Sequence, residues 1–251
     1  MILIYAILFC VIAANSSEIR EFKCEFTNNA IFGYSCEFRR AEWNDRENEI
    51  ISRDNHLKDK SDKDVKMVSF IDSNIKFIHD GIFSAFINLE ILDLSKAKMT
   101  TWTRGDLKGA KKLKRLVLAQ NELTEIADNS FLGAITLEHL SIDANKIVTL
   151  HDKAFNALTM LQSLDLSGNL LTIISANVLT PLKKLESINL SGNKIAIIEE
   201  GAFIGNTRLE FLNLQENLIE KIDENAFTTL TSLTILYLHQ NKIADLPEKI
   251  F

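Results

Sequence analysis

A repeat of 24 residues constrains this chain more than any other feature of its 251 residues. Shifting the sequence by that period aligns a column of leucines with no insertion. The column holds Leu89, Leu113, Leu137, Leu161, Leu185, Leu209 and Leu233, and Val65 extends it backwards. A fixed period of roughly 20–29 residues is typical of a solenoid, in which each unit is one small element stacked on its neighbours. The alignment predicts eight stacked units between Val65 and Phe251.

Each unit begins with the pattern LxxLxLxxNxL or a variant of it. The pattern adds two further apolar columns, which are Val68, Leu92, Leu116, Leu140, Leu164, Ile188, Leu212 and Leu236, and then Phe70, Leu94, Leu118, Ile142, Leu166, Leu190, Leu214 and Leu238. Because successive side chains of a strand face opposite sides, each unit should supply one short strand whose apolar residues point inward. Burying each of them between neighbouring units is worth roughly 1.5–3 kcal/mol. We therefore expect an α/β solenoid, a horseshoe of eight 24-residue repeats with short parallel strands on its concave face.

Two more apolar columns follow the strand in every unit. They are Ile78, Trp102, Ile126, Leu150, Ile174, Ile198, Ile222 and Leu246, and then Phe83, Leu107, Phe131, Phe155, Leu179, Phe203, Phe227 and Phe251. We interpret both columns as the lining of the convex side. The aromatic column is core packing rather than a cofactor site, and we expect no cofactor.

A column of asparagines marks the point where each strand turns toward the convex side. It holds Asn121, Asn145, Asn169, Asn193, Asn217 and Asn241, with Ser73 and Ala97 in the first two units. A side-chain amide offers two donors and an acceptor, so these residues can bridge consecutive turns by satisfying buried backbone groups. We expect looser geometry at Ser73 and Ala97.

Units such as LQSLDLSGNLLTIISANVLTPLKK and LEFLNLQENLIEKIDENAFTTLTS resemble the typical extracellular class of leucine-rich repeat. The resemblance covers residues 65–251 and includes Toll-type receptor ectodomains, Slit-like guidance proteins and the secreted leucine-rich immune proteins of insects. It implies that the repeat array binds another macromolecule. Innate-immune recognition is the leading functional interpretation, and a cell-adhesion or developmental-signalling ectodomain is the alternative.

The chain starts with an uncharged apolar segment, MILIYAILFCVIAA, that ends abruptly at polar residues. A hydrophobic stretch of roughly 7–15 residues followed by small residues is typical of a secretory signal peptide. We assign residues 1–16 to it and expect cleavage between Ala13 and Ser16. The alternative is an uncleaved anchor, because no basic residue follows Met1. With the signal removed, we expect a secreted, extracellular chain without a membrane span.

Residues 17–64 should form a cap that shields the open edge of the first strand. Cleavage would remove Cys10 and leave Cys24 and Cys36, and an even number of cysteines in an oxidising compartment favours a disulfide between them. Two free thiols are the alternative. The segment FKCEFTNNAIFGYSCEF resembles the caps of secreted insect members, although many caps in the family carry four cysteines.

The net charge of −6 and the mixture of both signs along the chain argue against a nucleic-acid partner. No second pair of Cys or His residues lies near the two cysteines, so we expect no metal site. One glycosylation sequon starts at Asn189, on the expected concave face, and another at Asn15.

Outward residues of neighbouring strands form columns on the concave face, since such strands lie about 4.8 Å apart. We expect a partner site for a protein or glycan where aromatic side chains lie beside amides. It comprises Phe211, Asn213, Gln215, Ile235, Tyr237 and His239. The alternative is a packing surface for sequence beyond Phe251.

A hydrolase site on the same face is a third alternative, because His139, Ser141, Ser163 and Asp165 lie on adjacent predicted strands. No strained turn presents either serine and no oxyanion site is implied, so we expect no enzymatic activity.

The last unit has no cap in this sequence, so Leu233, Leu236 and Leu238 should lack cover on one side. We expect either self-association through this end or missing downstream sequence, and favour the latter.

Overall fold

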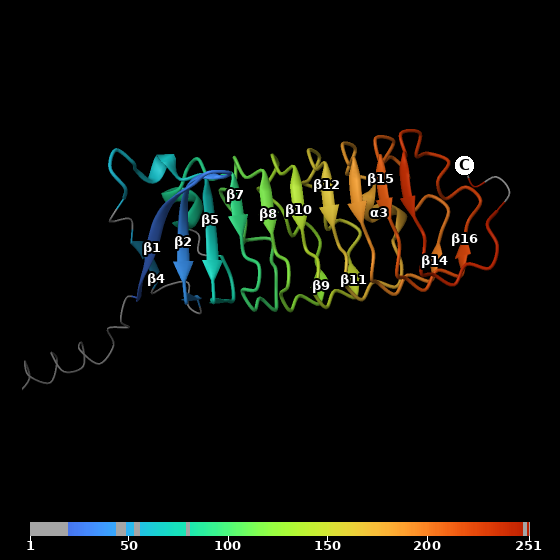
Figure 1. Cartoon of the computed structure of the whole chain (residues 1–251), viewed down its shortest axis with the longest axis horizontal. Helices are drawn as coiled ribbons and strands as arrows, with labels where there is room; N and C mark the ends of the chain where they lie inside the picture. Colours follow the sequence, from blue (N-terminus) through green and yellow to red (C-terminus); the bar gives the residue numbers. More distant parts are fainter. Residues whose placement is uncertain (1–19, 44–48, 53–55, 79–80, 248–249, 251) are drawn as a thin grey trace, which may run out of the picture.

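The computed structural model describes residues 20–43, 49–52, 56–78, 81–247 and 250. They form one elongated stack of coils, which runs from the N-terminal strands at one end to the last repeat at the other (Figure 1). The predicted signal peptide, the sequon at Asn15 and the final residue Phe251 lie outside the described residues.

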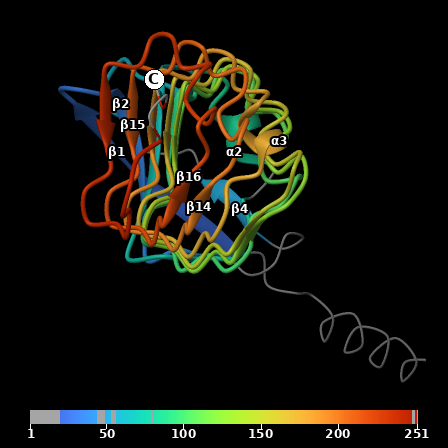
Figure 2. The ribbon, with the colours of Figure 1, turned by 90° about the vertical axis from the view of Figure 1, so that its right-hand side faces the viewer.

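One parallel strand per repeat builds one side of this stack. The strands are β5 (Met67–Ile71), β7 (Ile91–Asp93), β8 (Arg115–Val117), β10 (His139–Ser141), β12 (Ser163–Asp165), β13 (Ser187–Asn189), β15 (Phe211–Asn213) and β17 (Ile235–Tyr237). The register places Leu164 beside Leu140 and Ile188, which reproduces the shift of 24 residues. Figure 2 looks along the stack and shows these strands superimposed on the side opposite the helices. The predicted solenoid with eight parallel repeat strands is confirmed.

Helices are few on the returning, convex side of the described chain. They are α2 (Gly81–Ala85) and α3 (Ala176–Leu179), and most other loops consist of turns. Short parallel pairs join β9 (Glu125–Ile126) to β11 (Thr149–Leu150) and β14 (Ile197–Ile198) to β16 (Lys221–Ile222). Isolated helices shorter than about 12 residues are marginal in water, so packing between coils rather than helix formation holds these loops.

The predicted inward columns form a continuous core between the two sides. On the strand side Leu92, Leu116 and Leu212 have no exposed surface. On the convex side Phe131 and Phe155 are equally buried, and their rings stack with centroids 5.7 Å apart. The aromatic column is therefore packing, as its apolar neighbours predict.

The asparagine column bridges consecutive turns as predicted. Asn169 shows the pattern: its Nδ2 donates to the carbonyls of Ile142 and Leu166 at 3.0 Å each, and its Oδ1 accepts the Ile147 N–H at 3.1 Å. The same bonds recur with a period of 24 residues at Asn145 and Asn193. Each amide thus ties its own turn to the preceding coil.

The first two units keep a bridge by other means, with hydrogen bonds as short as those of the asparagines, so the looser geometry expected there is not observed. Ser73 Oγ accepts the Ala41 N–H at 3.0 Å and donates to the Ile71 carbonyl. At Ala97 the backbone carbonyl accepts the Ile75 N–H at 2.9 Å. The residues before and after Ala97 are both in the left-handed conformation, with φ of 57°. A backbone acceptor therefore replaces the missing amide at the expense of a second unusual φ.

The cap is a hairpin that extends the sheet beyond the first repeat. Strand β1 (Arg20–Asn29) pairs antiparallel with β2 (Gly33–Arg39), and β2 pairs parallel with β5. Strand β4 (Glu49–Ser52) adds to the outer edge of β1, and β3 (Glu42–Trp43) pairs with β6 (Asn74–Ile75).

A disulfide and an aromatic cluster hold this cap together. Cys24 and Cys36 are joined across the hairpin, as the sequence predicts, with Cα atoms 5.5 Å apart. Buried Phe38 and Trp43 pack against Phe70 of the first repeat, with ring centroids 5.1 and 4.8 Å from it. The cap therefore covers the first open end of the repeat core.

The last repeat is less enclosed than the others. Leu236 and Leu238 are half-buried, whereas Leu212 and Leu214 one coil earlier have no exposed surface. Leu236 also lines an open cavity of about 450 Å³, and β17 is the edge strand of the described sheet. The expected lack of cover is observed, while self-association or further sequence as its completion stays a prediction.

Replacing Leu164 by alanine should lower the free energy of unfolding by about 2–5 kcal/mol, because a cavity would open between three coils. The neighbouring outward residue gives a matched control: Ser163→Ala should change it far less, since Ser163 is half-exposed on the concave face. Urea denaturation of the two variants measures the difference. Equal losses would contradict the assignment of inward and outward positions.

Closing the short loop from Cys24 to Cys36 should stabilise the cap by roughly 2–4 kcal/mol. Peptide mapping of the secreted chain without reduction should find the two cysteine peptides linked and neither thiol alkylated. Alkylation of both thiols before reduction would show that the hairpin lacks this bond.

Candidate functional site

The concave face carries the side chains that alternate with the buried leucines. In β10, for example, His139 and Ser141 are half-buried on this face while Leu140 between them is 2% exposed. Each strand contributes only a few such side chains, so a site on this face must combine several repeats.

An aromatic cluster forms where β15 and β17 end the array. We call Phe211, Ile235, Tyr237 and His239 the aromatic patch. The Tyr237 ring meets the Phe211 ring edge-on, with centroids 5.6 Å apart and planes at 90°. On its other side it meets the His239 ring at 5.9 Å. The structure therefore brings together the four ring-bearing and apolar residues of the predicted partner site.

The two amides of the predicted site are less exposed than Ile235 and Tyr237. Asn213 is only 7% exposed, and its Oδ1 accepts the Gln215 N–H at 3.0 Å. Gln215 is half-buried beside it. Asn213 thus fixes the chain where it leaves β15. The exposed members of the patch are Ile235 and Tyr237, each 43% exposed, and His239.

The middle of the face is a network of short polar side chains. Asp165 Oδ1 accepts the N–H of Ser167 at 2.9 Å and its hydroxyl at 2.6 Å. Asn189 makes the same pair of contacts with Ser191, and its Nδ2 lies 3.4 Å from Asp165 Oδ2. These contacts continue from coil to coil and leave the face flat and hydrophilic.

The residues considered for catalysis line one shallow cavity of about 180 Å³. His139, Ser141, Ser163 and Asp165 all border it, as the register of their strands requires. The Ser141 hydroxyl donates to Asp143, however, and within the described chain no hydrogen bond links His139 to either serine. The pair of nucleophile and base that acyl transfer needs is therefore not assembled.

The surroundings of the His139 imidazole disfavour its charged form. Partial burial lowers the pKa of His139 below the usual value for histidine, and the positive charge of Arg115 on the adjacent strand lowers it further. The carboxylates of Glu138 and Glu186 oppose this shift without cancelling it. Burial and the charge of Arg115 therefore both favour the neutral form of His139.

The sequon residue Asn189 lies on the concave face, where the repeat register places it. Its amide is half-buried and bound to Asp165 and Ser191. A glycan on Nδ2 would leave one amide hydrogen for the contact with Asp165. Glycosylation of Asn189 stays a prediction.

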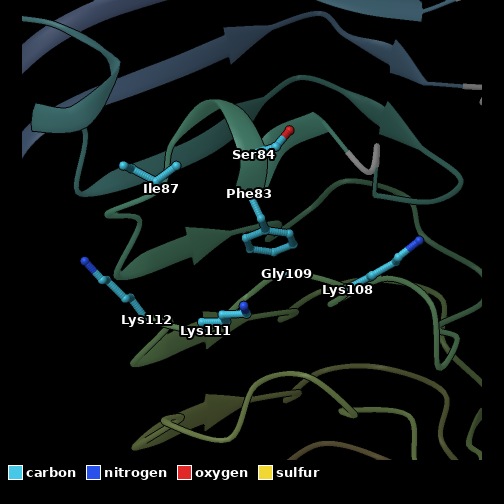
Figure 3. Close-up of a pocket in the computed structure, with 7 residues that line it drawn as sticks. All are labelled: Phe83, Ser84, Ile87, Lys108, Gly109, Lys111 and Lys112. Atoms are coloured by element: carbon cyan, nitrogen blue, oxygen red, sulfur yellow. The ribbon is translucent and has the colours of Figure 1, made fainter.

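A groove on the convex side escaped the analysis of the sequence. It lies beside α2 and is bordered by Phe83, Ile87, Lys108 and Lys111, with a volume of about 480 Å³ (Figure 3). The signal was present: residues 104–112 hold four Lys and Arg residues and one acidic residue. The net charge of the whole chain concealed this local excess.

Within the described ranges, no three His, Cys, Asp or Glu side chains converge as ligands for a metal ion. Nor does any helix among those residues combine the length and apolar character needed to cross a bilayer.

The chain belongs to the leucine rich repeat family. The family profile matches residues 68–123, 135–195 and 193–243, which together make up more than half of the chain. No curated protein sequence matches the chain.

Two solved structures show what the array is similar to. A chain of the TLR13–ssRNA13 complex is 32% identical, with a TM-score of 0.68 over 72% of this chain. A chain of the octameric complex of latrophilin 3, Unc5D and FLRT2 (LRR) is 29% identical, with a TM-score of 0.67 over 75% of this chain. The match spans only 26% of the first of those chains and 58% of the second. The predicted resemblance to Toll-type ectodomains is thereby confirmed.

Replacing Arg115 by glutamine should raise the pKa of His139, because the like charge on the adjacent strand is removed. In the unchanged chain, the NMR titration midpoint of His139 should lie below that of a histidine in the urea-unfolded chain. As the pH falls, the unfolded state therefore binds the proton before the folded state does. The free energy of unfolding should decrease as the pH is lowered through the ordinary histidine range. A midpoint at or above the unfolded value would contradict this account.

Proposed function

We propose that this chain is a secreted, non-enzymatic binding protein that holds a protein partner on the aromatic patch. The supporting observation is the edge-on contact of Tyr237 with Phe211, which leaves 43% of Tyr237 exposed beside the polar middle of the face. Tyrosine and tryptophan anchors surrounded by polar groups dominate the energetics of many interfaces. The ring contacts hold Tyr237 in place before binding, so the Tyr237 side chain loses less freedom when a partner binds it.

An extracellular location is supported by the disulfide between Cys24 and Cys36, because such bonds persist in oxidising compartments. It is supported further by the similarity to TLR13 and to the FLRT2 complex. The signal peptide in residues 1–16 is part of the same proposal.

Innate-immune recognition is the leading biological role that we propose for this protein, and the similarity to TLR13 supports it. Adhesion or developmental signalling is the second candidate, supported by the similarity to the complex that contains latrophilin 3, Unc5D and FLRT2. A binding panel of microbial surfaces and of cell-surface receptor ectodomains separates them. Selective binding to the microbial members favours the first role, and selective binding to receptors favours the second.

The double variant Phe211→Ala, Tyr237→Ala should lose the partner, since removing an interface anchor costs about 2 kcal/mol or more, a factor of about 30 in affinity. The chain and the variant are immobilised and exposed to the extracellular fluid of the source tissue. Captured proteins are quantified by mass spectrometry, and the leading one is then tested as a purified protein.

A matched control removes exposed apolar side chains elsewhere: Val148→Ala, Ile173→Ala. These residues are 53% and 50% exposed and lie away from the concave strands. The control should keep the partner. If the patch variant binds the purified partner as tightly as the control does, the aromatic patch is not the binding site.

A further inference from the structure

A second surface, on the opposite side of the array and near its other end, is independent of the aromatic patch. The groove beside α2 continues into an adjoining cavity of about 510 Å³. Lys108 borders both cavities, Phe83 and Ile87 border the first, and Leu132 borders the second. Figure 3 shows Lys108, Lys111 and Lys112 around the Phe83 side of this groove.

The groove has an uncompensated positive charge. The acidic residue within 104–112, Asp106, is 2% exposed, and its carboxylate accepts the Thr103 N–H at 2.6 Å and the Thr103 hydroxyl at 2.8 Å. Lys112 Nζ donates to the neutral amide of Asn88. Across the described residues, Lys108 and Lys111 have no carboxylate within ion-pair distance, and both are exposed. The chain thus concentrates cations here despite its net charge of −6.

Exposed aliphatic side chains flank these cations. Ile87, Lys111 and Ile135 occupy the same position in three consecutive repeats. Ile87 is 51% exposed and Ile135 57%. Leu132, which follows Lys108 by one repeat, is 42% exposed. A solvated surface gains nothing from three such residues placed together, so the apolar side chains need an explanation beyond stability.

Two glycines keep the groove open between the coils. Gly109 has a φ of +95°, and a Cβ there would lie 3.2 Å from the Phe83 Cβ. Gly133 has a φ of +109°, and a Cβ there would lie 2.4 Å from the Leu107 carbonyl oxygen. Neither position therefore carries a side chain that could fill the space between Phe83 and the lysines.

We call Lys108, Lys111 and Lys112, with Ile87 and Ile135 beside them, the basic ridge. We propose that the basic ridge docks on the anionic surface of a lipid bilayer. Lys108, Lys111 and Lys112 contact the headgroups, while Ile87 and Ile135 enter the interfacial layer beside them. Each lysine held near an anionic leaflet contributes a factor of about five in affinity. A sulfated glycan or a nucleic acid would use the cations but would leave the isoleucines exposed to water. The combination of charge and exposed aliphatic surface is the pattern of peripheral membrane binding.

Cosedimentation with vesicles tests this proposal on the full secreted chain. Vesicles of equal parts phosphatidylserine and phosphatidylcholine should bind the chain, and pure phosphatidylcholine should not. Lys108→Glu with Lys111→Glu should lower the partition coefficient at least 25-fold, because two attractive charges become repulsive. Ile87→Ser with Ile135→Ser should lower it several-fold at unchanged charge. Circular dichroism melts verify that both variants are folded.

The repeat provides a matched control. Lys183 occupies the position of Lys111 three repeats later, but its neighbours in that column are Thr159 and Thr207. Lys183→Glu should change the partition coefficient less than twofold. Vesicle binding that survives the isoleucine substitutions would show a general polyanion site and overturn the proposal, as would the absence of binding to anionic vesicles. Neither outcome bears on the aromatic patch.

Discussion

Burial between neighbouring coils is the interaction on which the rest of this structure depends. A single repeat cannot enclose its own leucines, so Leu164 becomes buried only because Leu140 and Ile188 lie beside it. Stability in such an array is close to a sum of nearest-neighbour contributions. The last repeat illustrates the rule, because Leu236 has one neighbouring coil and stays half-buried while Leu212 has two and is covered.

The asparagine column is the polar counterpart of that burial. Turning the chain inside a packed stack leaves backbone groups without water, and each such group left unpaired costs about 1–3 kcal/mol. The turn also requires a left-handed residue just before the asparagine, which is Gly168 in one unit but Gln120 and Glu216 in others. Non-glycine residues hold this conformation because hydrogen bonds between consecutive coils fix the turn. The asparagine amides make these bonds in most units, and Ser73 Oγ and the Ala97 carbonyl make them in the first two.

The sequence predicted those parts of the fold that the period of 24 determines. Strand positions, their register, the inward columns and the asparagine bridges all follow from it. The disulfide followed from the count of cysteines. The cap strands β1 and β4 and the scarcity of convex helices did not follow, because those segments either lie outside the period or depend on packing more than on pattern.

The candidate sites were predictable to a lesser degree. The columns identified the members of the aromatic patch, but not the burial of Asn213, because a column shows which side chains are neighbours and not how they pack. The basic ridge was missed because charge was judged over the whole chain. Even a local count of cations would not have shown that Asp106 turns inward to Thr103 and leaves the ridge uncompensated.

Both proposed sites consist of side chains that the stacking of repeats does not require. Every repeat has nearly the same backbone, so positions one period apart face nearly the same structural demands. The repeats on either side of Lys183 have threonine at the equivalent position, whereas the repeats on either side of Lys111 have isoleucine. Small polar residues fill the outward strand positions in the middle of the array, whereas Phe211 and Tyr237 fill two near the end. Because the two sites lie on opposite sides and near opposite ends of the array, a lipid surface and a protein partner can be held at the same time.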